Sequence, residues 1–335
     1  MKHNTIILIF LSVFFLSCKE SKSKPEVERI SLMPTHIVSD SIESMMPGEM
    51  YLSGNYLLWT DPFNNESFIH VLDINTGDEL GRLIKMGEGP EEFVSPQLAV
   101  MPDNRLFVYD LFANRCAIVA IDEYLEGQDS AIQFQENKTT DVTSLICLED
   151  GSLITFTPSK SEPFMLLEKK QSFGKLPFKG DISNGHDHFQ GLVRYNPYNG
   201  YLYYSTFKMP YFALYKKSGN SFKLETEELR TDDCTVKDNN LLYNGSQRGP
   251  IEVSLTADYI ATVDTDPKAE PIDYFKIGRD YTKLPQTLCL YDYNLHLRKV
   301  IDIGMPILRV ASSPKDNTLY LLSANPEFIL YRIEL

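Results

Sequence analysis

Asn104-Arg105-Leu106-Phe107-Val108-Tyr109-Asp110 is the stretch that decides the fold, because its pattern occurs six times along the chain. Each copy begins with a turn-forming Asn, Asp or Gly, continues with aliphatic and aromatic residues, and stops at a small polar or acidic residue. Gly, Asn and Asp tolerate the backbone angles of a tight hairpin, and the run that follows has the composition of a strand. The other five copies are centred on Leu57, Leu153, Leu202, Ile260 and Leu319.

The spacing of these copies predicts an all-β fold built from radial repeats. The central residues of successive copies lie 49, 47, 49, 58 and 59 positions apart, and a period near ~50 residues with several strands per unit is typical of a β-propeller. An apolar segment precedes each copy, a second strong strand follows it, and a more polar segment closes most repeats. We therefore expect six blades, each with four antiparallel strands.

The two ends of the chain indicate how the ring closes. The sixth repeat stops at Leu335 after its third strand, so it lacks an outer strand. Arg29–Met33 is strand-like and has no blade of its own. We expect this N-terminal strand to supply the missing edge of the last blade, because an unpaired edge strand invites aggregation.

Residues 1–17 are predicted to be a signal peptide rather than part of the fold. Lys2 and His3 precede an apolar run, residues 6–15, of the length of a signal-peptide core and too short to span a bilayer. The run ends in Leu16-Ser17-Cys18, which resembles a bacterial lipobox and implies lipidation of Cys18. An ordinary cleaved signal is the alternative. We assign residues 18–27, which are charged and Ser/Lys-rich, to a flexible tether, and residues 28–335 to the propeller.

Composition narrows the class of partner. The net charge is −14, and removing the segment before Cys18 would make it −15. Nucleic acid and anionic lipid surfaces need a basic face, so we expect no nucleic-acid partner and membrane association through the lipid anchor alone. Four further cysteines lack zinc or redox spacing, and the sequence indicates no disulfide pairing among them: Cys116, Cys147, Cys234 and Cys289.

A Gly-Pro turn joins the first two repeats and carries a family resemblance. Gly87-Glu88-Gly89-Pro90-Glu91-Glu92-Phe93 lets the backbone cross from rim to channel in few residues. We interpret it as a structural turn, with Gly87, Gly89, Pro90 and Phe93 as its key residues, rather than as a ligand site. This turn and the regular spacing of the strands resemble those of the six-bladed β-propeller lipoproteins of Bacteroidetes, the TolB-like and NHL-like propellers. The resemblance covers residues 28–335 and implies fold and export rather than chemistry.

Six residues are candidates for a ligand-binding face. Loops from an outer strand to the next inner strand share one face with loops between the two central strands, and these loops contain Asp61, Glu88, Glu91, Arg115, His188 and Arg248. The alternative for Asp61 is a structural role in which its carboxylate caps a turn. Calcium is the one cofactor that we consider, because carboxylates suit a hard cation, but the sequence identifies no metal ligands. Two enlarged loops, Glu225–Gln247 and Asp264–Thr287, either cover a ligand or are neutral insertions.

The sequence favours a binding protein over an enzyme. It contains no Gly-x-Ser-x-Gly, no His-Glu-x-x-His and no Cys with a credible catalytic His. We therefore expect a monomeric, lipid-anchored propeller of the cell envelope, on the outer membrane, that binds a protein, a glycan or a small molecule. The alternative is a calcium-assisted lactonase, lyase or glycosidase that uses the channel. Two or more converging carboxylates with Asn at the channel mouth would favour the enzyme, and a channel plugged by aromatics such as Tyr195, Tyr204 and Phe207 would favour the binder.

Overall fold

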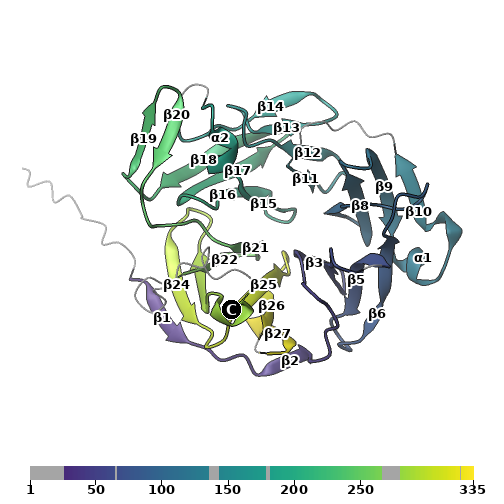
Figure 1. Cartoon of the computed structure of the whole chain (residues 1–335). Coiled ribbons are helices and arrows are strands. Elements are labelled where there is room, and N and C mark those ends of the chain that lie inside the picture. Colours follow the sequence, from purple (N-terminus) through teal and green to yellow (C-terminus); the bar gives the residue numbers. More distant parts are fainter. Residues whose placement is uncertain (1–25, 65, 136–142, 179–181, 266–279, 325) are drawn as a thin grey trace, which may run out of the picture.

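The computed structural model describes residues 26–64, 66–135, 143–178, 182–265, 280–324 and 326–335. Within these ranges the chain forms six four-stranded antiparallel blades around a central axis, as the sequence predicted (Figure 1). The inner strands contact one another in a closed ring, from the first blade through the sixth and back to the first. The predicted signal peptide and most of the predicted tether, Cys18 included, lie outside the described residues.

The strands follow the chain around the ring, from the inner strand to the outer strand of each blade. The first blade contains β3 (Met50–Ser53), β4 (Tyr56–Thr60), β5 (Ser67–Asp73) and β6 (Glu79–Lys85). The second contains β7 (Gln97–Met101), β8 (Arg105–Asp110), β9 (Arg115–Ala120) and β10 (Ile132–Gln135). The third contains β11 (Ser144–Cys147), β12 (Leu153–Phe156), β13 (Phe164–Leu166) and β14 (Gln171–Phe173).

The fourth blade contains β15 (Gly191–Asn196), β16 (Tyr201–Thr206), β17 (Tyr211–Ser218) and β18 (Ser221–Leu229). The fifth contains β21 (Glu252–Leu255), β22 (Ile260–Asp264), β23 (Thr287–Tyr291) and β24 (Leu297–Asp302). The sixth contains β25 (Ile307–Ser312), β26 (Thr318–Ala324) and β27 (Phe328–Glu334). All six repeated motifs of the sequence therefore form the second strand of a blade.

An N-terminal strand completes the last blade, but its residues differ from those predicted. β2 (His36–Ser39) pairs antiparallel with β27 and supplies the missing outer edge. Arg29–Met33 was the wrong segment. It lies mainly in β1 (Glu28–Ser31), which pairs parallel with β24 and adds a fifth strand to the fifth blade. Both edges are thereby covered before the chain enters the first blade (Figure 1).

The hydrophobic core is divided among the interfaces between blades. Six clusters of buried side chains each combine two neighbouring blades, and the cluster around Trp59 and Tyr320 joins the first blade to the sixth. The central strands are buried on both faces, which explains their near-continuous apolar composition. Because each blade packs only on its neighbours, the chain needs no single large core.

Short helices and one extra hairpin decorate the ring. The helices are α1 (Ile121–Leu125), α2 (Gly185–Phe189), η1 (Asp129–Ala131) and η3 (Tyr281–Lys283). The enlarged loop Glu225–Gln247 begins as the end of β18 and then forms a hairpin of β19 (Cys234–Lys237) and β20 (Asn240–Tyr243). Asn184 beside α2 exchanges two hydrogen bonds of 2.9 Å with the backbone of Leu241, so the hairpin packs on the fourth blade. Most of the other enlarged loop lies outside the described residues.

Candidate ligand-binding site

A pocket of about 600 Å³ opens where the inner strands of all six blades end. We call this side of the disc the hairpin face, because it carries the turns that join the first and second strands of each blade. The opposite side, which carries the loops that run from one blade to the next, is the crossover face. Residues that line the pocket include Ser53, Asn104, Glu149, Arg194, Tyr198, Leu255 and Lys315. The pocket therefore opens on the face opposite to the six candidate residues.

Deeper in the channel, four charged side chains from four blades form what we call the channel cluster: Glu49, Arg194, Glu252 and Arg309. Glu49 directly precedes β3, whereas the other three lie on inner strands. Nη1 of Arg309 lies 2.8 Å from Oε1 of Glu252, and Nη2 of Arg194 lies 3.5 Å from Oε2 of Glu49. The Tyr51 hydroxyl also donates to Glu49.

The two arginines of the channel cluster differ in how many of their donors are used. Arg309 donates from Nε to the carbonyls of Pro47 and Gly48, at 3.0 and 2.8 Å, and from Nη1 to Glu252. It thereby ties the sixth blade to the fifth and to the entry of the first. Arg194 makes one hydrogen bond to the described residues, from Nη1 to the neighbouring Val193 carbonyl at 3.0 Å, beside its long contact with Glu49.

The two carboxylates of the channel cluster are in different environments. Burial raises the pKa of Glu252 above its ordinary value, since nearby Arg309 only partly offsets the loss of water and Glu49 adds repulsion. Burial also opposes ionisation of Glu49. Its pKa nevertheless lies below the ordinary value, because Arg194, the Tyr51 hydroxyl and Arg309 together favour the charged form. The Glu49 side chain is 46% exposed toward the open channel.

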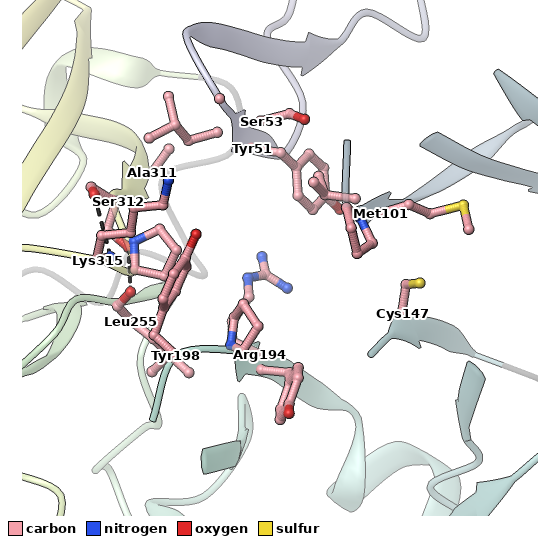
Figure 2. Close-up of a pocket in the computed structure, with 18 of the residues that line it drawn as sticks. Tyr51, Ser53, Met101, Cys147, Arg194, Tyr198, Leu255, Ala311, Ser312 and Lys315 are labelled. Atoms are coloured by element: carbon pink, nitrogen blue, oxygen red, sulfur yellow. Dashed lines mark hydrogen bonds between the residues drawn. The ribbon is translucent and has the colours of Figure 1, made fainter. Parts of the chain in front are cut away.

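Tyrosines and hydroxyls surround the pocket above the channel cluster (Figure 2). The Tyr195 hydroxyl donates to Glu149 at 2.6 Å, and Lys217 pairs with the same carboxylate. Tyr198 is 60% exposed at the rim, where the Lys315 ammonium lies 5.4 Å from its ring centroid. These groups give the pocket aromatic surfaces and polar groups close together.

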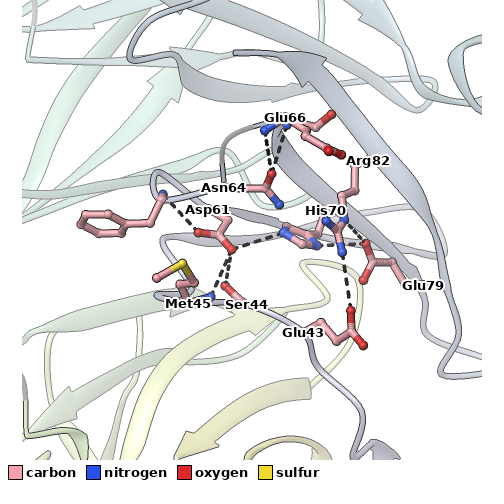
Figure 3. A network of polar contacts seen from close by, with 11 residues as sticks. Glu43, Ser44, Met45, Asp61, Asn64, Glu66, His70, Glu79 and Arg82 are labelled. Atoms are coloured by element: carbon pink, nitrogen blue, oxygen red, sulfur yellow. Dashed lines mark hydrogen bonds and ion pairs between the residues drawn. The ribbon is translucent and has the colours of Figure 1, made fainter. Parts of the chain in front are cut away.

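Among the candidates on the crossover face, Asp61 is buried at the end of β4 (Figure 3). Its Oδ2 accepts from the Ser44 hydroxyl at 2.7 Å and from the Met45 N–H at 3.3 Å, and its Oδ1 accepts from the Phe63 N–H at 3.2 Å. Nε2 of the buried His70 lies 3.4 Å from Oδ2. Asp61 therefore joins the loop that enters the first blade to the turn that follows β4.

Asp110, at the end of β8, has the same role in the second blade. Its Oδ2 accepts from the N–H groups of Val94 and Ser95 at 2.6 and 2.8 Å, and its Oδ1 accepts from those of Phe112 and Ala113, both at 2.9 Å. The acidic stop of the repeated motif thus supplies acceptors for buried backbone donors, which would otherwise be costly.

The Gly-Pro turn is locked by its own side chains. The Glu92 carboxylate accepts from the Gly89 N–H at 2.8 Å, and Arg115 donates to the Gly89 carbonyl at 2.5 Å and also to that of Glu92. Phe93 is fully buried, whereas Pro90 is exposed. Gly87 has a φ of 150°, a conformation that side chains rarely adopt. Arg115 thus braces the turn.

The remaining candidates lie on two parts of the crossover face. Glu88 and Glu91 are exposed on the Gly-Pro turn. His188 and Arg248 belong to the fourth blade and its exit: His188 is buried and contacts the Asn184 amide at 3.1 Å, and Arg248 donates to the Lys208 carbonyl at 2.9 Å. Burial and the nearby charge of Lys208 lower the pKa of His188. The structure does not join the six candidates into one site.

Exposed apolar side chains lie on crossover-face loops of the first two blades. Phe112 is 83% exposed and Met45 is 74% exposed, and Val94 and Leu111 are also exposed. Asp110 accepts from the N–H groups of both Val94 and Phe112, which holds the backbone of these residues close together, and we call Val94, Leu111 and Phe112 the exposed patch. The sequence motifs did not indicate this patch.

No metal centre is apparent within the described ranges. No three His, Cys, Asp or Glu side chains gather there closely enough to hold an ion, and the two carboxylates of the channel cluster are each in contact with an arginine. None of the four cysteines of residues 28–335, all of which the structure describes, forms a disulfide, and burial raises the pKa of Cys147, which lines the pocket, to about 12. None of the described helices is long and apolar enough to cross a bilayer.

The fold and its pocket define a six-bladed β-propeller with a polar channel. Comparison with protein-family models and with curated sequences gives no match. A solved Bacteroides fragilis protein, named as exported, has a TM-score of 0.58 at 11% identity, over 92% of this chain and 99% of that one. A luciferin-regenerating enzyme has a TM-score of 0.52 at 10% identity, over 90% and 95%. Such identities show the fold alone, and the resemblance to lipoproteins stays a prediction.

Sequence reasoning missed the residues of the pocket, with one exception. Tyr195, named as a channel aromatic that would favour a binder, lines the pocket. Tyr204 is buried between the third and fourth blades, and Phe207 packs against the cluster between the fourth and fifth blades. The one signal that could have identified Arg194 is its position three residues before the Pro197 turn, near the hairpin-face end of an inner strand.

Proposed function

We propose that the protein is an exported, lipid-anchored, monomeric binding protein of the cell envelope that takes a small ligand into the hairpin-face pocket. The observation that carries the proposal is a pocket of about 600 Å³ built from the inner strands of six blades, with Arg194 directed into it. Small-molecule sites commonly enclose about 300–1,000 Å³ and combine apolar walls with a few polar groups. Because the ring is preformed, little conformational entropy is lost on binding.

The export and anchoring part of the proposal rests on residues 1–18. The apolar core and the Leu16-Ser17-Cys18 pattern support it, as does the name of the structurally similar Bacteroides protein. Changing Cys18 to Ala should move the protein from the membrane fraction to the soluble fraction. Unchanged membrane retention of this variant would contradict lipidation.

The calcium-assisted enzyme is less well supported than the binding protein. A hard cation needs several free oxygen ligands, and Glu49 and Glu252 are each in contact with an arginine. A lactonase, lyase or glycosidase would also need a carboxylate free to act as an acid, a base or a nucleophile. Calcium nevertheless belongs in the first ligand screen, because a metal response would reverse this preference.

A second candidate function is protein docking on the crossover face, and the exposed patch of Val94, Leu111 and Phe112 favours it. Glu88 and Glu91 lie beside this patch on the Gly-Pro turn. An apolar centre with an acidic edge fits a protein partner whose surface has an apolar centre and a basic edge. A second copy of this chain would place the acidic edges against each other.

The test is a thermal-shift screen of the full-length protein with calcium, zinc, EDTA, sugars, organic acids and peptides. A ligand at 100 times its Kd should stabilise the native state by about 2.7 kcal/mol, or about 4 °C for a chain of this size. The shift should be smaller in Lys315→Trp, which narrows the pocket rim, and unchanged in Lys223→Trp on the exposed outer strand β18. Shifts with calcium alone would favour the enzyme, and no shift with any small molecule would refute the pocket proposal.

A further inference from the structure

Of the two arginines of the channel cluster, Arg194 makes fewer hydrogen bonds to the described residues. A guanidinium has five N–H donors, yet Arg194 makes one hydrogen bond and one contact of 3.5 Å to the described residues. That contact is longer than an ordinary N–H···O bond of about 2.7–3.2 Å. Figure 2 shows the guanidinium pointing into the open centre of the ring, between Tyr51 and Tyr198. Its fork of donors is therefore available to a ligand in the pocket.

The geometry of a guanidinium suits a carboxylate. Two parallel N–H groups match the two oxygens of a carboxylate, and such bidentate pairs are among the stronger hydrogen bonds in proteins. Arg309 is less suited to this role, because its Nε and Nη1 hold Pro47, Gly48 and Glu252 and only Nη2 has no hydrogen-bond partner among the described residues. Arg194 is thus the group in the channel cluster that can receive an anion without breaking a contact between blades.

The charge of the site limits the charge of the ligand. Glu49 lies beside Arg194, and its lowered pKa favours the charged carboxylate. This negative charge would repel a dianion such as a phosphate monoester. Lys315 at the rim adds a second cation, with its ammonium over the ring of Tyr198, whereas Asp103 and Glu149, the latter paired with Lys217, add carboxylates to the pocket wall. A ligand with one negative charge matches this balance better than one with two.

Aromatic surfaces in the pocket provide a place for a ring. Tyr198 is 60% exposed at the rim, and the Arg194 guanidinium lies 5.8 Å from the centroid of the Tyr51 ring. The Ser254 and Ser312 hydroxyls also line the pocket, but Ser254 donates to Ser312 at 2.6 Å and Ser312 donates to the Leu255 carbonyl at 2.7 Å. Tyr51 and Tyr198 therefore provide the aromatic surface on which a ring can pack.

We infer that the pocket selects a small ligand with one carboxylate on a six-membered ring, the carboxylate bound by Arg194 and one face of the ring packed on a tyrosine. This inference rests on the proposed function, because it names the ligand class of the same pocket. An acidic sugar and an aromatic acid share this chemistry. The acid that binds more tightly separates the two classes, and one neutral analogue of each tests whether the carboxylate is required.

The experiment is isothermal titration calorimetry of the full-length protein with D-glucuronate, D-glucose, benzoate and benzyl alcohol. At least one acid should bind about tenfold or more tightly than its neutral analogue. Arg194→Gln should weaken binding of that acid by about tenfold to a hundredfold, the effect of losing charge-assisted hydrogen bonds, and leave the neutral analogue unchanged. Arg194→Lys should give an intermediate Kd. Arg298→Gln, which removes the same charge from strand β24 outside the pocket, should bind like the wild type.

Each failure has a distinct meaning. If neutral and acidic analogues bind equally and Arg194→Gln changes neither, the carboxylate inference is wrong and the pocket remains a binding site. If none of the four compounds binds, the inference is also wrong. The thermal-shift screen then decides the proposed function, because a shift by another compound that Lys315→Trp reduces would preserve it. Circular dichroism of the variants checks that the ring is intact.

Discussion

Removing the carboxylate of Asp110 tests whether the acidic stop of the repeated motif stabilises the blades. This side chain is fully buried and accepts four backbone N–H groups, two from the loop that enters the second blade and two from its own turn. Asp110→Ala leaves all four donors without this acceptor. Asp110→Asn replaces one oxygen with an NH₂ group, which must then face two N–H donors.

The expected magnitude follows from these four bonds. A hydrogen bond to a charged group contributes about 1.5–3 kcal/mol, which would give about 6–12 kcal/mol if the contributions added fully. Water can replace part of this, because the side chains of Val94 and Phe112 are exposed beside the donors. We therefore expect Asp110→Ala to cost about 3–5 kcal/mol, a fall in Tm of about 4–7 °C for a chain of this size. Asp110→Asn should cost nearly as much.

Differential scanning calorimetry of the wild type and both variants measures this effect. Asp129→Ala is the matched control, since it removes an exposed carboxylate from the same blade and should change Tm by less than about 1 °C. A stability of Asp110→Asn within about 0.5 kcal/mol of the wild type would refute the reasoning, because an amide cannot accept all four bonds.

Three further predictions concern ring closure, the Gly-Pro turn and the channel cluster. Deleting residues 1–33 removes the exposed β1 and the partly buried Val27 and Leu32 and should cost about 1–2 kcal/mol. Deleting residues 1–40 also uncovers β27 and should cost at least about 3 kcal/mol in urea unfolding, and equal effects would contradict closure by β2. Gly87→Ala should lower Tm more than Gly89→Ala, because only Gly87 has a positive φ and its added Cβ would lie 2.0 Å from Glu92 Oε2; the reverse order would locate the strain at Gly89. The pKa of Glu252 is raised above its ordinary value of 4.5 in the folded protein, so the wild type loses stability as the pH rises through and above 4.5. The Tm of Glu252→Gln minus that of the wild type should therefore increase between pH 4.5 and 7. A difference in Tm that does not change with pH would argue against the raised pKa.

The strand arrangement was predictable because its signal is local and repeated. Each copy of the motif places a hairpin turn before a strand that is buried on both faces, and six copies leave little freedom in the count of blades. The closing strand was harder to identify, since Arg29–Met33 and His36–Ser39 both have strand composition. The choice depends on which free edge each segment reaches: β1 meets the outer edge of β24, and β2 reaches β27.

The crossover-face candidates show why residue type alone does not identify a site. Asp61 and Asp110 end equivalent strands, and a carboxylate in a loop can bind either a ligand or backbone N–H groups. Both side chains are buried and bind backbone donors, which depends on how closely the incoming loop approaches. Arg115 binds carbonyls of the Gly-Pro turn for the same reason. Sequence spacing predicts on which face of the disc a side chain lies, but not how closely a neighbouring loop approaches it.

The difference between Arg194 and Arg309 comes from depth along the inner strands. Arg194 pairs with Tyr203, one residue after the central Leu202 of its repeat, whereas Arg309 pairs with Leu322, three residues after Leu319. Arg309 therefore lies further from the hairpin face, at the level where the chain enters the first blade, and its donors meet the carbonyls of Pro47 and Gly48. Arg194 lies nearer the pocket, where no loop crosses its guanidinium. A displacement of two residues along equivalent strands thus separates an arginine that closes the ring from one that is available to a ligand.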